Sequence, residues 1–228
     1  MIAKKQAVRE TGAGSDDQIA LAVQDFWGAR STGTQSAKHD KAFLRLIADE
    51  FASLGWPAHI PQSFRDPSAV VAGHFRVAKS WDIVCRDPEG APRICVEFKS
   101  QVDSYGNNEN NRYEEALGSG LDVRAKHGSD TVLGFVFVIC DEPATRSITR
   151  PRLPDLDPAF ENSSHVDRRR IFSERIVEYK LNGASLYDAA ALLLVRRDGT
   201  FEHPENPDLR LVNFADKLAR AANDRAKR

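Results

Sequence analysis

The sequence lacks the features that mark secreted, membrane-spanning and zinc-binding proteins. Cysteine occurs only three times in 228 residues, with no CxxC pair and no Cys/His spacing of a zinc site. Because Cys85, Cys95 and Cys140 lie in apolar runs, we expect buried free thiols in a reducing cytoplasm. No apolar run approaches the roughly 20 residues that span a bilayer, and the first residues, MIAKKQAVRE, lack the apolar segment of a signal peptide. We therefore expect no association with a membrane.

Net charge is also nearly absent. The chain has 32 Lys and Arg residues and 33 Asp and Glu residues, which gives a formal net charge of −1. The net charge therefore does not indicate a polyanionic partner. Any surface that binds nucleic acid must be local and balanced by acidic patches elsewhere. This neutrality argues mildly against a protein that coats DNA non-specifically, but hardly against an enzyme that acts at one site.

The length and the apolar periodicity favour one α/β domain with a mixed central sheet flanked by helices. We expect a flexible leader over residues 1–15 and a single domain over 16–228. Apolar pieces within residues 57–80 could supply a strand that enters a central hairpin. Helices are expected near 16–27, 40–54, 108–126, 163–179 and 208–222, and strands near 81–99, 131–140 and 188–196.

For two of the expected helices, the apolar pattern also predicts which side chains face inward and which face outward. In the helix after the hairpin, the pattern places Leu117 and Leu121 on the apolar face. In the next helix it places Arg168, Arg169 and Arg170 outward, away from Ile171 and Ile176.

The most informative stretch is Trp81–Ser100, WDIVCRDPEGAPRICVEFKS. It holds two apolar runs joined by a turn-rich hexapeptide, and alternation along the second run places Glu97 and Lys99 opposite an apolar face. If the two runs pair as a hairpin, Asp82 lies close to both side chains. Two carboxylates and a lysine at one point suit a divalent metal ion and a water to be activated. The alternative is a plain solvated strand face, since an acid, a gap and ExK also occur by chance.

Glu50 is a further acidic candidate. It falls on the apolar stripe of the helix near 40–54, where a carboxylate needs a partner. Glu50 could therefore bind a second metal ion or act through a metal-bound water near the catalytic carboxylates. The alternative is a helix-edge glutamate that pairs with a lysine or an arginine.

The acidic strand, the ExK strand and the helices around them resemble the PD-(D/E)xK nuclease core. The pattern reads Asp82, fourteen intervening residues and then Glu97-Phe98-Lys99, with Trp81 in place of the proline that gives the motif its name.

A closer resemblance starts at the ExK strand. The run EFKSQVDSYGNNENNRYEEALGSGLDV, with AVQDFW and AKHD earlier in the chain, is similar to the XhoI family of type II restriction endonucleases. The string NNxNNRxEEALGS is much more specific than ExK alone. By these strings the similarity extends from Gln18 to about Gly134, and the last third of the chain carries no such signature.

The resemblance implies a Mg²⁺-dependent homodimer in the bacterial cytoplasm. It would cut double-stranded DNA at a palindromic hexamer, CTCGAG in the family, and leave 5′ overhangs. A partner methyltransferase would protect the host's own sites without forming a stable complex. Asp82 and Glu97 would hold the metal, the Phe98 carbonyl could be a third ligand, and Lys99 would contact the attacking water and the scissile phosphate.

Base recognition is expected from the amide-rich segment after the ExK strand. Asparagine pairs bidentately with adenine and arginine with guanine in the major groove, although asparagines also cap helices and form turns. Gln101 is expected nearer the phosphate, and Lys38 lies in a loop that could touch phosphates. Arg146, Arg150 and Arg152 could clamp the DNA backbone or simply be solvated. The recognition candidates are Asn107, Asn108, Asn110, Asn111 and Arg112.

Two other functions stay open. One is a repair or recombination nuclease of the same fold with a loose sequence preference, and the other is a non-catalytic DNA-binding relative. Digestion of a plasmid of known sequence separates them, since a restriction enzyme gives discrete fragments, a loose nuclease gives a smear and a binding protein gives neither.

Overall fold

A computed structural model describes residues 15–31, 39–63, 66–106, 109–148 and 153–227. Within these residues, the centre of the fold is a six-stranded sheet in the order β1-β4-β5-β6-β9-β10. The inner strands β5, β6 and β9 are parallel, and the outer pairs are antiparallel, so the sheet is mixed as the sequence predicts. The strands are β1 (Ala58–His59), β4 (Ile83–Arg86), β5 (Pro92–Gln101), β6 (Val132–Cys140), β9 (Ala189–Val195) and β10 (Phe201–Glu202).

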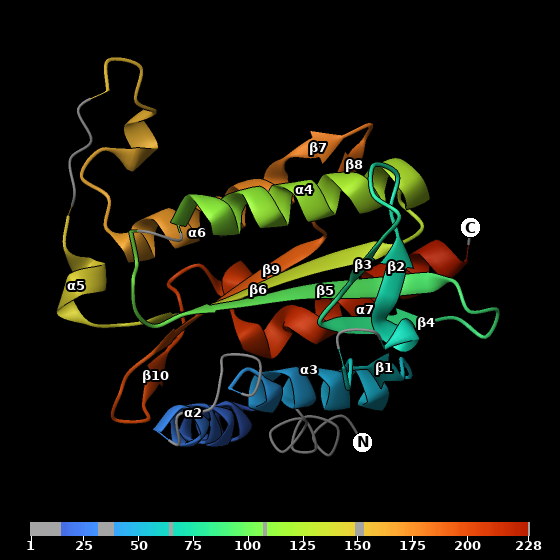
Figure 1. Cartoon of the computed structure of the whole chain (residues 1–228), viewed down its shortest axis with the longest axis horizontal. Coiled ribbons are helices and arrows are strands. Elements are labelled where there is room, and N and C mark those ends of the chain that lie inside the picture. The colour runs from blue at the N-terminus through green and yellow to red at the C-terminus, as the bar shows by residue number, and fades with distance from the viewer. Residues whose placement is uncertain (1–14, 32–38, 64–65, 107–108, 149–152, 228) are drawn as a thin grey trace, which may run out of the picture.

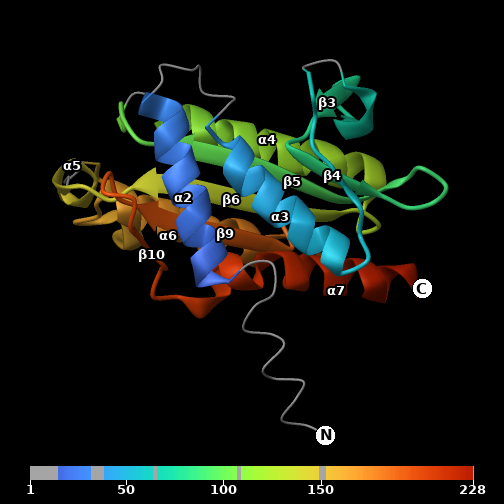
Figure 2. The ribbon, with the colours of Figure 1, turned by 90° about the horizontal axis from the view of Figure 1, so that it is seen from below.

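Helices cover both faces of this sheet, as Figures 1 and 2 show. The helices α2 (Asp16–Ser31), α3 (Lys41–Ser53) and α7 (Phe214–Ala226) lie on one face. The opposite face carries α4 (Glu109–His127) and α6 (His165–Glu178), with the short α5 (Pro143–Arg146) following β6. No helix of the described ranges is long and apolar enough to cross a membrane.

Alternation along β5 divides the core in two. Ile94, Val96 and Phe98 pack with the helices of the first face, while Cys95 packs with those of the second. All nine residues of β6 are buried, as expected for a parallel strand covered on both sides. The sequence predicted both patterns correctly, and the three cysteines are buried and free.

Residues 70–80 differ from their predicted place in the central sheet. They form a separate antiparallel pair, β2 (Val70–Ala72) and β3 (Ala78–Ser80), preceded by a 3-10 turn at Pro67–Ala69. The physical reason is that β4 already pairs with β1 on one side and with β5 on the other, so no free strand edge remains beside it. The pair instead extends from the edge of the sheet over α4 (Figure 1). A second small pair joins β7 (Lys180–Leu181) to β8 (Ala184–Ser185).

Two helix faces also differ from prediction. Leu117 and Leu121 of α4 are 44% and 41% exposed, because α4 instead buries Ala116, Gly120 and Val123. In α6, Arg169 is buried rather than outward. Its guanidinium carbon lies 4.5 Å and 4.4 Å from the ring centroids of Tyr113 and Phe137, so π faces replace part of its hydration.

The last helix starts later than predicted. Pro207–Leu209 and Leu211–Asn213 form 3-10 turns, with the Asn206 side chain capping the first of them, and α7 begins only at Phe214. This delay lets the apolar side of α7 pack closely on β6, where Gly134 faces the side chains of Phe214 and Leu218.

Candidate active site

The β4–β5 hairpin brings the predicted acidic residues together. Ile83 pairs with Val96, so the next pair along the ladder sets Asp82 opposite Glu97. The Asp82 backbone N–H donates to the Val96 carbonyl over 3.1 Å, and the Phe98 N–H donates to Asp82 Oδ2 over 2.7 Å. The predicted meeting of Asp82 with Glu97 is therefore confirmed.

Glu97 is the most deeply buried carboxylate of this cluster, with 1% of its surface exposed. Each of its oxygens accepts a different ammonium group, Oε2 from Lys79 and Oε1 from Lys99. Burial alone would raise the pKa of Glu97, but the two ammonium groups outweigh burial and hold this pKa below its ordinary value. Glu97 is therefore ionised at neutral pH despite its burial.

Asp82 is electrostatically different from Glu97. Burial, together with repulsion from the nearby Glu97 carboxylate, raises the pKa of Asp82 to about 6. The hydrogen bond from the Phe98 N–H and the charges of Lys99 and Lys79 act in the opposite direction. Two carboxylates of unequal proton affinity thus face one another at one end of the hairpin, with an amine beside them.

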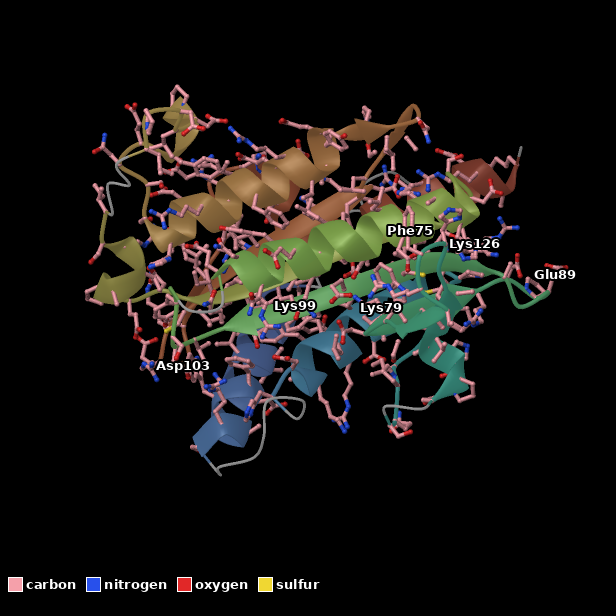
Figure 3. All side chains as sticks on the ribbon, turned by 45° about the horizontal axis from the view of Figure 1, so that its top comes forward. Phe75, Lys79, Glu89, Lys99, Asp103 and Lys126 are labelled. Atoms are coloured by element: carbon pink, nitrogen blue, oxygen red, sulfur yellow. The ribbon has the colours of Figure 1, made fainter. Side chains whose placement is uncertain are left out.

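Two clefts meet at Asp82 and Lys99. The larger, of about 640 Å³, lies between the two hairpins and α4, and Glu97 and Lys79 line it. The smaller cleft, of about 340 Å³, is lined by Asp40 and by two arginines, Arg30 and Arg112. The carboxylate pair is therefore open to a ligand from two directions, and Figure 3 shows Lys79 and Lys99 in the region between β5 and α4.

Lys79 is a site residue that the sequence analysis missed. It lies on β3, and its Nζ also donates to Ser119 Oγ of α4 over 2.7 Å and lies 4.8 Å from the centre of the Trp81 ring. Burial lowers the pKa of Lys79, against the raising effect of Glu97, whereas for Lys99 the raising effect of Glu97 outweighs burial. Alternation counted back from Asp82 through Ser80 would not have placed Lys79 beside Glu97. Lys79 lies on β3 and Glu97 on β5, and alternation relates only side chains of one strand.

The structure brings Asp40 to the site instead of Glu50. Asp40 precedes α3 and faces Ser100 and Lys99, and burial raises its pKa. Its Oδ1 has no hydrogen-bond partner within the described residues. Glu50 lies ten residues further along, about 15 Å at 1.5 Å per helical residue, and its charged neighbour is Asp216 of α7. The expectation that Glu50 adjoins the catalytic carboxylates is corrected accordingly, and no ion pair of Glu50 with a lysine or an arginine occurs among the described residues.

We expect Glu50→Gln to stabilise the protein at alkaline pH. Burial and the Asp216 charge raise the pKa of Glu50 to about 8. The folded carboxyl thus holds its proton more tightly than the unfolded one, so stability falls as pH rises from about 4.5 and the loss is complete above about 8. After allowance for partial exposure, glutamine should recover roughly 1–2 kcal/mol at high pH, or about 2–8 °C in Tm.

Thermal melts of Glu50→Gln and the native chain at acidic and alkaline pH measure this effect. Asp49→Asn is the matched control, because Asp49 is exposed on the same helix. Equal changes in Tm at both pH values would show that charge on Glu50 is not the cause.

Gln101 is almost fully buried, although it borders the smaller cleft. It is 6% exposed, its Nε2 donates to the carbonyl of Tyr105 over 3.0 Å, and its Oε1 accepts from Arg169 Nη2 over 2.8 Å. Gln101 therefore positions the loop that leads to α4, and the expectation that it lies near the phosphate stays a prediction.

Of the predicted recognition residues, the three within the described ranges lie at the start of α4, and Arg112 lines the smaller cleft. Asn110 and Asn111 are exposed on the first turn. Arg112 lines the cleft with Lys99 and Asp82, and its Nη1 donates to Glu115 Oε2 over 3.0 Å. Arg146, the last residue of α5, pairs with Asp141 and lines neither cleft. Asn107, Asn108, Lys38, Arg150 and Arg152 lie outside the described residues.

The donor set at the hairpin fits a hard divalent cation of the Mg²⁺ type. Such an ion is held by one or two carboxylates and keeps several waters, and Asp82 and Glu97 are two carboxylates of that kind, with Phe98 lining the smaller cleft beside Asp82. No group of three or more His, Cys, Asp or Glu side chains that could enclose a metal occurs in the ranges described, so a closed zinc-type site is not among them. Because both Glu97 oxygens are paired with ammonium groups, a cation bound there would replace one of these ion pairs.

Comparison with known proteins identifies the family of the chain. The family model for restriction endonuclease XhoI matches residues 18–202. The type II restriction enzyme BstVI of Geobacillus stearothermophilus is 28% identical over 81% of this chain and 89% of its own. XhoI of Xanthomonas vasicola is 27% identical over 71% and 75%, and AbrI of Azospirillum brasilense is 30% identical over 62% and 72%.

No solved structure matches the chain. The family match covers most of the sequence and includes both strands of the carboxylate hairpin. The chain therefore belongs to the XhoI family of type II restriction endonucleases.

Proposed function

We propose that this protein is a Mg²⁺-dependent endonuclease that cuts double-stranded DNA at a palindromic site, CTCGAG by analogy with the family, within a bacterial cytoplasmic restriction-modification system. The observation that carries the proposal is the convergence of Asp82, Glu97 and Lys99 at the meeting point of two open clefts. A cognate methyltransferase would protect the host's sites without a stable complex.

In this proposal each residue of the cluster has a separate role in phosphodiester hydrolysis. A magnesium ion, when bound by Asp82, Glu97 and the Phe98 carbonyl, would lower the pKa of a coordinated water and offset charge on the phosphate. Lys99 Nζ donates to the attacking water and to a non-bridging phosphate oxygen. The water oxygen forms a bond to phosphorus and its proton passes to solvent, while the bond from phosphorus to the leaving sugar oxygen breaks and that oxygen takes a proton from solvent.

Lys79 and Asp40 extend this cluster. Because Lys79 neutralises Glu97 in the absence of DNA, its ammonium is available to a phosphate once a metal ion takes over that carboxylate. Asp40 faces Lys99 from the start of α3, where it keeps the amine oriented. In this proposal Asp40 is a positioning residue, whereas Lys79 becomes a phosphate contact.

A palindromic site is matched most simply by a two-fold protein dimer, so we propose a homodimer. The recognition candidates at the start of α4 would then read each half-site while the carboxylate pair addresses the phosphate beside it. The amides of Asn110 and Asn111 suit adenine and the Arg112 fork suits guanine.

Digestion of a plasmid of known sequence tests the function directly. Discrete fragments in Mg²⁺, with ends that sequence to one palindrome, are the expected result. A smear of fragments would instead indicate a loose nuclease, and intact plasmid at every metal concentration would contradict the enzymatic proposal.

We expect Arg112→Ala to weaken binding to the specific duplex by about 10- to 100-fold, and binding to a scrambled duplex much less. The reason is that a bidentate contact to a base discriminates by roughly 1–3 kcal/mol, whereas a phosphate contact does not depend on sequence. Fluorescence anisotropy with both duplexes measures the difference. Arg220→Ala is the control, because Arg220 is two-thirds exposed on α7 and pairs only with Asp216 among the ion pairs of the described chain. Equal losses on both duplexes would identify Arg112 as a phosphate contact.

A further inference from the structure

The loop that joins β2 to β3 displays apolar side chains to solvent. It spans Gly73–Val77, and Phe75 and Val77 within it are 70% and 94% exposed. Other large apolar side chains are exposed elsewhere, but these two stand two residues apart beside a charged cleft. Phe75 and Arg76 line the same 640 Å³ cleft that holds Asp82 and Glu97.

The loop is held rigidly by Asp122 of α4. The carboxylate of Asp122 accepts the backbone N–H groups of His74 and Phe75 over 2.8 Å and 2.7 Å, and Arg76 Nε over 2.8 Å. Its side chain is only 3% exposed, and these donors hold its pKa below the ordinary value against the opposing effect of burial. A Cβ at Gly73 would lie 2.0 Å from Asp122 Oδ2, so only glycine permits this contact. The exposed side chains therefore project from a fixed backbone.

The opposite end of the same hairpin is tied to the catalytic cluster. Lys79 on β3 pairs with Glu97, and Figure 3 shows Lys79 near Lys99 with Phe75 further along α4. Phe75, Arg76 and Lys79 line one cleft with Glu97, so the loop and the catalytic cluster border the same space. A duplex with its phosphate at Glu97 would therefore lie against the loop.

We propose that the Gly73–Val77 loop enters a groove of the bound DNA next to the scissile phosphate, where Phe75 and Val77 make apolar contacts with the bases. This inference rests on the proposed function, because the DNA is placed by the catalytic cluster. The Arg76 side chain, within the loop and 43% exposed, places a cation beside the DNA backbone. A thymine methyl or an unstacked base step accepts apolar side chains. Asp122 fixes the loop before DNA arrives, so little ordering is needed on binding.

The first test separates apolar contacts from phosphate contacts. The double variant Phe75→Ala, Val77→Ala should bind a short CTCGAG duplex about 10- to 100-fold more weakly than the native chain, with the slope of log Kd against log salt unchanged. Loss of an arginine or lysine at a phosphate would instead reduce that slope by about one. Because both side chains are exposed, the melting temperature should not fall, and a changed slope or undiminished affinity would overturn the proposal.

The second test places the loop on the DNA directly. The photoreactive analogue p-benzoylphenylalanine replaces Phe75 and, as a matched control, Glu89 in the exposed turn at the far end of the β4–β5 hairpin (Figure 3). Illumination with the duplex in Ca²⁺ should cross-link position 75 but not position 89. A chain that cuts the plasmid yet gives no cross-link at 75 overturns the inference and leaves the proposed function intact. A native chain that neither binds nor cuts the duplex overturns both.

Discussion

Asp82→Asn and Lys99→Ala are each expected to lower the single-turnover rate of DNA cleavage by at least about 10³-fold while the protein stays folded. Asp82 supplies one of two carboxylates at the proposed metal site, and an amide is a neutral, much weaker ligand. Lys99 pairs with Glu97 and lines both clefts. The fold should survive, because asparagine keeps an oxygen acceptor for the Phe98 N–H, and Lys79 still neutralises Glu97 when Lys99 is removed.

Cleavage of a radiolabelled duplex at saturating enzyme measures these rates, and melting curves report the fold. Lys126→Ala is the matched control, because Lys126 is an exposed lysine in the last turn of α4 (Figure 3). Undiminished cleavage by either active-site variant would exclude the assigned role. If a variant melts far below the native chain, the rate loss is attributed to unfolding only when binding to the duplex is lost as well.

The part of the site that the sequence predicted is local in the chain. Period-2 alternation fixes that Glu97 and Lys99 share a face, and a short turn between two apolar runs fixes the hairpin that carries Asp82 to them. Nothing outside Trp81–Ser100 is needed for either step. The same locality explains why the buried strand β6 was predicted correctly, since parallel strands covered on both faces are apolar throughout.

The part that the sequence did not predict depends on packing between elements. Lys79 reaches Glu97 only because β2 and β3 leave the central sheet and fold over α4. Asp40 and Glu50 lie near opposite ends of α3. The amphipathic pattern of this helix does not indicate which end lies beside the β4–β5 hairpin. The AKHD string, part of the family resemblance, ends at Asp40 and was the available signal for it.

Arg169 illustrates the same limit for buried charge. Its position in a run of three arginines favours a solvated face, yet Tyr113, Phe137 and Gln101 surround it. Those partners come from α4, β6 and β5, which lie 32 to 68 residues away in sequence. Hydrophobic periodicity treats every arginine as polar, so it has no means of predicting that aromatic rings will accept one inside the protein.

Asp188→Ala is expected to cause the largest loss of stability, about 3–5 kcal/mol, or roughly 6–20 °C in Tm. Asp188 precedes β9, and its Oδ2 accepts the Leu133 N–H over 2.8 Å and Arg124 Nη2 over 2.6 Å. Arg225 of α7 pairs with its other oxygen. The Arg124 side chain is only 2% exposed, so removal of Asp188 leaves a buried guanidinium without its counter-charge.

Urea unfolding of Asp188→Ala against the native chain measures the loss. Asp224→Ala is the control, because Asp224 is exposed on α7 and its pairing with Lys227 spans 3.3 Å at the surface, where such a pair contributes under about 1 kcal/mol. A loss below about 1 kcal/mol for Asp188→Ala would show that the backbone carbonyls around Arg124 suffice to hold its charge. The double variant Arg124→Met, Asp188→Ala separates the causes: if the unpaired charge dominates, removing it should recover part of the stability, since an uncompensated buried ion costs more than the loss of the pair.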